Sequence, residues 1–183
     1  KRKSAAETKE RDKYNIKKHL CKNIELKDTT DDLCVFGLFG PKSRNLMKTL
    51  SNDNFDNEDF KFGTAKYVTI EGLKIWTQRL SYVGELGYEL YVNTKDAKKL
   101  YELIIQKGKD FNLSNCGMHA MDIMRMESGF LHWGHDISPE ENQYQAGLSF
   151  TISSKKEVDF IGRRALEKIK QNKVKTRFAM FIL

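Results

Sequence analysis

The stretch TAKYVTIEGLKIWTQRLSYVGELGYELYV (64–92) decides the fold, because apolar and polar side chains alternate through most of it. An alternation with a period of two predicts strands that bury one face. Glu71-Gly72 interrupts the pattern and predicts a hairpin between strands at 64–72 and 73–81. A further strand is expected at 87–92.

The segments around this stretch predict an α+β protein. LCVFGLF (33–39) is apolar, aromatic and too short for a helix, so it predicts a buried strand. The expected strands are 23–28, 33–39, 64–72, 73–81, 87–92, 147–153 and 176–183, and the expected helices are 4–20, 42–50, 95–107, 117–128 and 159–171. We therefore expect antiparallel or mixed sheets with ferredoxin-like βαββαβ elements flanked by helices.

The composition argues against several classes of protein. The 183 residues are 39% hydrophobic and 11% aromatic, which suits a packed domain rather than a disordered chain. The net charge of +7 comes from scattered lysines and arginines without a nucleic-acid-binding motif, so nucleic acid is not an expected partner. The three cysteines are widely spaced, as in a reducing compartment, and no apolar run reaches the roughly 18 residues of a membrane span.

Glu89 is the first candidate for ligand binding. Gly84 and Gly87 bracket Glu85 and permit a tight bend with a flat ligand close to the backbone. On the following strand Tyr88 faces one way and Glu89 the other. A carboxylate that points into the interior needs a partner, and the amino group and ring N–H of a pterin are two parallel donors. The alternative, a solvated Glu89 on an edge strand or paired with a lysine, stays open.

Two other motifs have simpler interpretations. HWGHD (132–136) has a His-x-x-His spacing followed by Asp, as metal sites can have, but Gly134 favours a loop and no third ligand with motif spacing lies nearby, so no metal is expected. In GMHAMDIMRMESG (117–129) methionines at helical spacing predict core packing. Arg125 and Glu127 are expected to form structural ion pairs.

Several segments together resemble the aminomethyltransferases (T-proteins) of the glycine cleavage system. SYVGELGYELYV (81–92) resembles the hallmark segment of that family, and FGLFGPKSRNLM (36–47) is similar to its strand, Gly-Pro turn and helix. The run 117–129 is similar to its G-x-x-A-x-D-x-x-R-x-E-x-G helix. HWGHDI (132–137) and the run from AGLSF to DFIGRRAL (146–166) resemble the folate-binding regions fused to dimethylglycine and sarcosine dehydrogenases.

The resemblance implies a domain organisation and a cofactor. Residues 1–173 would form a folate-binding domain without its amino-terminal part, and 174–183 the first strand of a truncated carboxy-terminal barrel. Both ends of the sequence look cut, so we expect a fragment of a longer protein. The implied cofactor is tetrahydrofolate, with FAD only if a flavin domain lies elsewhere in the parent protein.

The resemblance also assigns roles to residues. Glu89 takes the position of the carboxylate that holds the pterin, and Tyr82 that of an aromatic residue that contacts the folate. The residues assigned to cofactor binding are Tyr82, Gly84, Glu85, Gly87, Tyr88 and Glu89. The catalytic aspartate of the family lies upstream of the matched region, so this chain is expected to contain no catalytic residue and to be inactive alone.

The implied function is tetrahydrofolate-dependent transfer of an aminomethyl or methylene group. The expected partners are folate, an aminomethyl or methylamine-type donor and a fused or separate flavin dehydrogenase, in the cytoplasm or, in a eukaryote, the mitochondrial matrix. Met121 replaces a T-protein arginine, which favours the alternative of a folate-binding portion of a dimethylglycine or sarcosine dehydrogenase-like oxidoreductase. A non-catalytic interaction module and an RNA-modifying relative are further alternatives.

Overall fold

The computed structural model describes residues 8–153, 155–172 and 174–181. Its contacts divide the chain into two compact units. The first, here called the sheet unit, comprises Lys1–Ser81 and Glu85–Asn115, and the second, the loop unit, comprises Tyr82–Gly84 and Cys116–Leu183. The chain therefore leaves the sheet unit after Ser81 and returns to it at Glu85.

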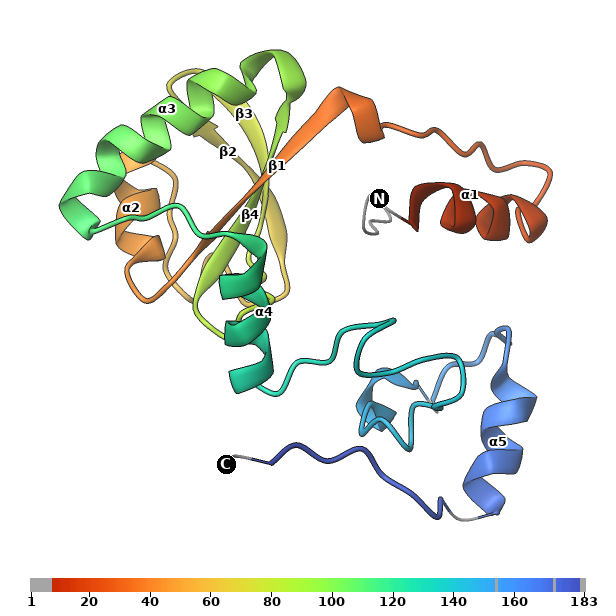
Figure 1. Ribbon diagram of the computed structural model, residues 1–183. Coiled ribbons are helices and arrows are strands. Elements are labelled where there is room, and N and C mark those ends of the chain that lie inside the picture. Colours follow the sequence, from red (N-terminus) through yellow and green to blue (C-terminus); the bar gives the residue numbers. More distant parts are fainter. Residues whose placement is uncertain (1–7, 154, 173, 182–183) are drawn as a thin grey trace. The chain divides into compact units, whose positions relative to one another are not determined.

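The sheet unit is built on a four-stranded antiparallel sheet with the strand order β1-β4-β3-β2 (Figure 1). The strands are β1 (Leu33–Phe39), β2 (Ala65–Ile70), β3 (Leu73–Gln78) and β4 (Gly87–Asn93). The strands predicted at 33–39 and 87–92 and the hairpin of 64–81 are confirmed. Strand β4 is paired on both sides, so the prediction that allowed Glu89 an edge strand is wrong.

Two helices of the sheet unit pack on one face of the sheet. They are α2 (Ser43–Leu50) and α3 (Ala97–Gly108), and their buried side chains join one apolar cluster with those of the strands. The α+β class and the order β-α-β-β-β-α are as expected. The strands on either side of α2 run antiparallel, with β4 and β3 between them, whereas the ferredoxin-like plan requires a parallel pair.

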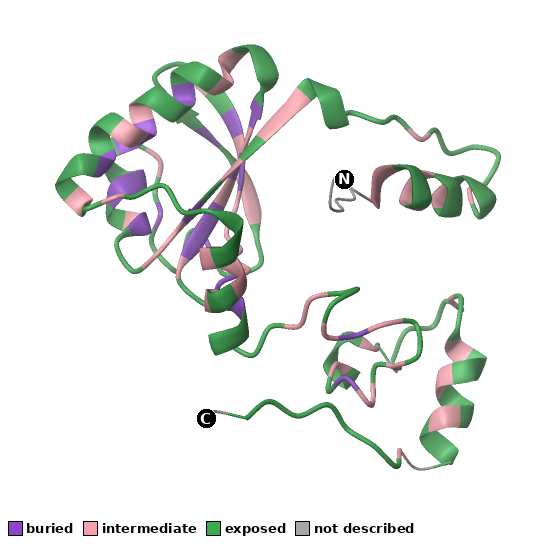
Figure 2. Ribbon diagram, viewed as in Figure 1, coloured by how far each residue is buried: buried purple, intermediate pink, exposed green. Residues whose placement is uncertain are grey.

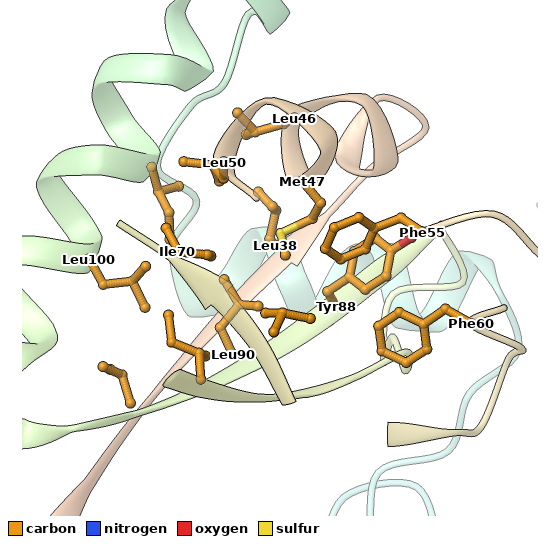
Figure 3. Packing of buried hydrophobic residues seen from close by; sticks show 14 residues of the cluster. Leu38, Leu46, Met47, Leu50, Phe55, Phe60, Ile70, Tyr88, Leu90 and Leu100 are labelled. Carbon is orange, nitrogen blue, oxygen red and sulfur yellow. The ribbon is translucent and has the colours of Figure 1, made fainter. Parts of the chain in front are cut away.

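The core lies between this sheet face and the two helices. Figure 3 shows Phe55, Phe60 and Tyr88 close together, below the side chains of α2. The ring of Tyr88 lies edge-on to Phe55, with centroids 5.7 Å apart. Burying one side chain of this size contributes roughly 1.5–3 kcal/mol. In Figure 2 most of the buried positions accordingly lie in the sheet unit.

Strand β1 is less buried than its composition predicted. Leu38 is buried, but Val35 on the opposite face is 51% exposed. Helices that cover one face of a sheet shield only every second side chain of an edge strand. Of the seven residues of β1, one is buried, four are partly buried and two are exposed, so the prediction of a buried strand was wrong for most of it.

The structure contradicts three other predicted strands over the residues that it describes. Residues 23–28 form no strand, because Asp28 accepts hydrogen bonds from the amide and hydroxyl of Thr30 and turns the chain. Residues 147–153 contain a 3-10 turn at Ser149–Thr151 instead. Residues 174–181 also form no strand, and the assignment of 1–173 and 174–183 to two family domains stays a prediction.

The remaining helices lie within the predicted ranges. They are α1 (Lys9–Lys18) in the sheet unit, and α4 (Met118–Glu127) and α5 (Arg163–Gln171) in the loop unit. Helix α5 begins four residues later than Asp159, the predicted first residue. Gly162, directly before it, has a left-handed φ of 94°, which a helix cannot include.

The hairpin turn between β2 and β3 has two residues with positive φ, at 45° for Glu71 and 78° for Gly72. This is the type I′ geometry that right-twisted hairpins prefer. Gly72 adopts this conformation without steric cost, whereas the Cβ of Glu71 makes it sterically unfavourable.

We therefore expect Glu71→Asn to raise the free energy of unfolding by about 0.5 kcal/mol, because asparagine enters the left-handed region more readily than glutamate. Thermal or denaturant unfolding measures the change. Glu71→Gln is the matched control, since it removes the charge without altering the backbone preference. Equal stability of the two variants would contradict the turn assignment.

Candidate ligand-binding site

Strand β4 places Glu89 on the face of the sheet opposite the core. Tyr88 and Leu90 are fully buried, while Glu89 and Tyr91 are half-buried. The predicted alternation of these side chains is confirmed. The open face therefore carries a carboxylate in the middle of the sheet, where neighbouring strands limit its exposure to water.

The neighbours of Glu89 come from three strands. Gly37 on β1 and Gln78 on β3 are its cross-strand partners. Along β4, the hydroxyl of Tyr91 donates a hydrogen bond to Glu89 Oε2. Within the described part of the chain, no lysine binds the Glu89 carboxylate. The alternative of a lysine partner is therefore not observed among these residues.

Two glycines beside Glu89 accommodate the ring of Phe39. A Cβ at Gly37 would lie 2.6 Å from Phe39 Cζ, and one at Gly87 would lie 2.4 Å from Phe39 Cδ1. Real carbon atoms do not approach so closely, so any larger residue would displace the ring. The space beside Gly87, which we expected to admit a flat ligand, is thus filled by an aromatic side chain of the protein.

The other predicted site residues of the sheet unit contribute differently. Glu85 is exposed in the loop before β4. Tyr88 has a relative exposure of 0% and packs with Phe55 and Phe60, which leaves its side chain no surface for a ligand. Of the predicted residues in this unit, only Glu89 presents a polar group on the open face.

Tyr82 and Gly84 belong to the loop unit. The Tyr82 hydroxyl donates to the carbonyl of Leu131 at 3.0 Å, and its ring stacks on Phe130 at 6.3 Å. Gly84 has a φ of 76°, and a Cβ there would lie 2.0 Å from Ser128 Oγ. Gly84 therefore serves both a left-handed turn and the close approach of Ser128.

The loop unit is organised around the guanidinium of Arg125, which is only 2% exposed. Its Nε contacts Asp122 Oδ1 at 2.7 Å, and its Nη1 contacts Asp136 and donates to the carbonyl of Phe130 at 3.0 Å. Asp136 in turn accepts a hydrogen bond from the His132 amide at 2.7 Å. The structural ion pair expected for Arg125 is confirmed, and it fixes the loop after α4.

The histidines of HWGHD lie close together without forming a metal cluster. The rings of His132 and His135 are 4.7 Å apart, and His132 Nδ1 is 3.8 Å from Asp122 Oδ1. Among residues 8–153, 155–172 and 174–181, no group of three potential ligands has the geometry to hold an ion. The third member of the motif, Asp136, binds Arg125 instead.

A shallow polar hollow of about 530 Å³ lies elsewhere on the sheet unit. It is lined by Thr49, Leu50, Ser51, Asn52, Asp53, Thr69, Glu71 and Gly72. Its Asp53 carboxylate already accepts hydrogen bonds from the Thr69 amide and the Ser51 hydroxyl, both at 2.8 Å. We place the candidate site at Glu89 because that carboxylate lies on the open face in the middle of the sheet and accepts one side-chain hydrogen bond, from Tyr91.

The sequence did not reveal several of these contacts. Phe39, Gln78 and Tyr91 lie on the same sheet face as Glu89, and the places of Phe39 and Gln78 there depend on the pairing of β1, β3 and β4. Only Tyr91, two residues from Glu89 on the same strand face, carried a local signal in the alternation.

Within the part of the chain that the structure describes, no helix combines the length and the apolar character that crossing a membrane requires.

An antiparallel sheet with helices packed on one face defines an α+β domain, and the half-buried carboxylate of Glu89 lies on the other face. The chain matches the GCVT N-terminal domain family over residues 3–156. It therefore belongs to this family, and the predicted resemblance is confirmed.

Known relatives include oxidoreductases and transferases. The chain is 34% identical over 161 residues to mitochondrial dimethylglycine dehydrogenase of Homo sapiens, covering 88% of this chain and 19% of that protein. It is 40% identical over 142 residues to 4-methylaminobutanoate oxidase (formaldehyde-forming) of Paenarthrobacter nicotinovorans, covering 78% and 17%. It is 37% identical over 150 residues to an aminomethyltransferase of Symbiobacterium thermophilum, covering 81% and 40%. The chain spans less than half the length of each relative.

Arg125→Met is expected to release the loop after α4. The variant keeps a long apolar side chain but leaves Asp136, whose side chain is only 21% exposed, without its cation. Loss of a partner from a buried ion pair costs about 3 kcal/mol, which corresponds to roughly hundredfold faster local opening. Hydrogen exchange of the His132 amide measures this opening. Arg164→Met, at an exposed position, is the control, and equal exchange in both variants would contradict the role of Arg125.

The same ion pairs predict sensitivity to acid. Burial alone would raise the pKa of Asp136, but the His132 amide and Arg125 outweigh it, so the pKa lies below its ordinary value of 3.8. Mainly through its hydrogen bond with Arg125, the pKa of Asp122 is also lowered. A carboxyl group with a lower pKa in the folded state stabilises the fold above the unfolded pKa, and this stability is lost as the pH falls through the folded pKa.

We therefore expect the Phe130 amide, which is bonded to the Arg125 carbonyl at 2.9 Å, to lose protection from exchange below about pH 4. Asp136→Asn should reduce this protection at pH 7 and weaken its dependence on pH, whereas the exposed control Asp159→Asn should change neither. Protection factors measured from pH 7 to pH 2 check this, and identical profiles for the parent and Asp136→Asn would disprove it.

Proposed function

We propose that this chain contributes the tetrahydrofolate-binding part of a one-carbon transferase. Its membership of the GCVT N-terminal domain family and its similarity to an aminomethyltransferase support this assignment. The observation that carries it is the Glu89 carboxylate. One of its oxygens accepts a hydrogen bond from Tyr91, and no other hydrogen bond in the described part of the chain reaches the carboxylate.

The chemistry of this carboxylate fits a pterin. A carboxylate accepts hydrogen bonds through two oxygens, and the pterin edge offers an amino group and a ring N–H as parallel donors. Each Glu89 oxygen has two lone pairs, so Oε2 can serve both Tyr91 and a ligand. Bonds of this charged kind contribute about 1.5–3 kcal/mol each where water is excluded.

Tetrahydrofolate, when bound, supplies the N5 nucleophile that takes up the one-carbon group. The residues of this chain would bind and orient the cofactor. Glu89 would hold the pterin edge, and Tyr82 would contact the folate. Gly84, Glu85, Gly87 and Tyr88 would support these positions through the loop before β4 and the first residues of that strand. We assign no proton transfer to a residue of this chain.

The donor of the one-carbon group distinguishes two versions of the proposal. Similarity to an aminomethyltransferase supports an aminomethyl donor. Similarity to dimethylglycine dehydrogenase and to a formaldehyde-forming oxidase supports an N-methyl amine that a flavin domain outside this chain would oxidise. Met121 on α4, in place of a T-protein arginine, favours the second version.

Glu89→Gln is expected to weaken tetrahydrofolate binding by about tenfold or more, because the amide can accept through only one atom and is neutral. Calorimetric titration of the full-length protein measures the dissociation constant.

The matched control is Glu102→Gln, the same chemical change on the exposed face of α3. Equal affinity of the parent and Glu89→Gln would show that Glu89 does not hold the pterin. Absence of binding to the parent at millimolar tetrahydrofolate would refute the proposed function as a whole.

A further inference from the structure

The side chain of Tyr91 is held beside Glu89 by its own neighbours. It lies on the open face of the sheet, where Val35 on β1 and Trp76 on β3 are its cross-strand partners. The Trp76 ring is packed in turn against Tyr67, with centroids 4.9 Å apart and planes at 65°. Directly opposite residues on antiparallel strands have Cβ atoms about 4.5–5.5 Å apart, so Tyr91 stands between two flanking side chains.

The chemistry of its hydroxyl makes Tyr91 a permanent donor. Burial, and then the hydrogen bond to the Glu89 carboxylate, raise the pKa of Tyr91 well above its ordinary value of 10.0. The hydroxyl therefore keeps its proton at neutral pH. Since a carboxylate can only accept, the bond from Tyr91 to Glu89 Oε2 has a fixed direction.

On this basis we infer that Tyr91 is a positioning residue, which holds the plane of the Glu89 carboxylate so that the site selects ring edges with two parallel N–H donors. This inference rests on the proposed function and adds the source of its selectivity. A glutamate side chain without such a contact rotates about its terminal bond. A rotating carboxylate binds a ligand with one N–H donor about as well as a ligand with two. Tyr91 fixes the orientation of the carboxylate plane, so that both oxygens face the ligand. Only a ligand with two donors can bind both oxygens.

Among the residues that the structure describes, the cross-strand neighbours of Glu89 do not provide a second donor that fixes its carboxylate. On the β1 side, Glu89 faces Gly37, which has no side chain, and the Phe39 ring lies over that glycine. On the β3 side, Gln78 is directly opposite and can contact a ligand edge but has no fixed charge. The hydroxyl of Tyr91 is the donor that the structure shows on the carboxylate itself.

The test compares two ligands on the full-length protein. One is tetrahydrofolate, and the other is its analogue with a methyl group in place of the 2-amino group, which retains a single donor on the pterin edge. Tyr91→Phe is expected to weaken tetrahydrofolate binding by about tenfold, and binding of the analogue by less than about twofold. The preference of the site for two donors should therefore fall by about fivefold or more.

Tyr67→Phe is the matched control, because it removes a hydroxyl from the same sheet face at a residue that is 48% exposed and away from Glu89. It should change neither dissociation constant. Glu89→Asp is a second variant, which draws the carboxylate away from Tyr91 without losing its charge, and it should lose the same discrimination. Melting curves show that each variant is folded.

The outcomes separate this inference from the proposed function. If Tyr91→Phe weakens the binding of both ligands equally, the role of Tyr91 is purely structural. If it changes the binding of neither, the contact with Glu89 is irrelevant to binding. Each of these results overturns the inference. If Glu89→Gln weakens tetrahydrofolate binding while Tyr91→Phe does not, the pterin site stands and only the positioning role fails. If neither variant has an effect, Glu89 does not hold the pterin, and the inference falls together with that part of the proposed function.

Discussion

Pairing of β4 on both of its sides is the constraint on which the rest of the sheet unit depends. The strand lies between β1 and β3, and its side chains alternate between the core and the open face. The register that buries Tyr88 and Leu90 also directs Glu89 and Tyr91 outward. A slip by one residue would bury the carboxylate and expose the core, so the hydrophobic core itself determines where the candidate site lies.

Two glycines, which have no side chain, shape the surroundings of Glu89. Gly37 and Gly87 leave room for the Phe39 ring, which lies next to the row of Glu89. The glycines thus serve a packing contact within the protein, at the positions across from Glu89 and two residues before it.

The loop unit obtains its order by a different physical route. Its described residues bury few apolar side chains, among them Val83, Ile137 and Ala146, and a long irregular segment follows α4. The guanidinium of Arg125 takes the place of a core by binding two carboxylates and a backbone carbonyl. Such a network depends on ionisation, whereas the core of the sheet unit does not, so the two units respond differently to acid.

The sequence by itself determined the features that arise from local patterns. Alternation identified β2, β3 and β4 and the opposite directions of Tyr88 and Glu89, and Glu71-Gly72 marked the hairpin. The strands predicted at 23–28 and 147–153 are absent because such short segments carry no information about a pairing partner. Only the tertiary structure decided the order β1-β4-β3-β2, and with it the contacts of Glu89 with Gly37 and Gln78. Hydrogen bonds between strands far apart in the sequence set that order, and no local propensity encodes them.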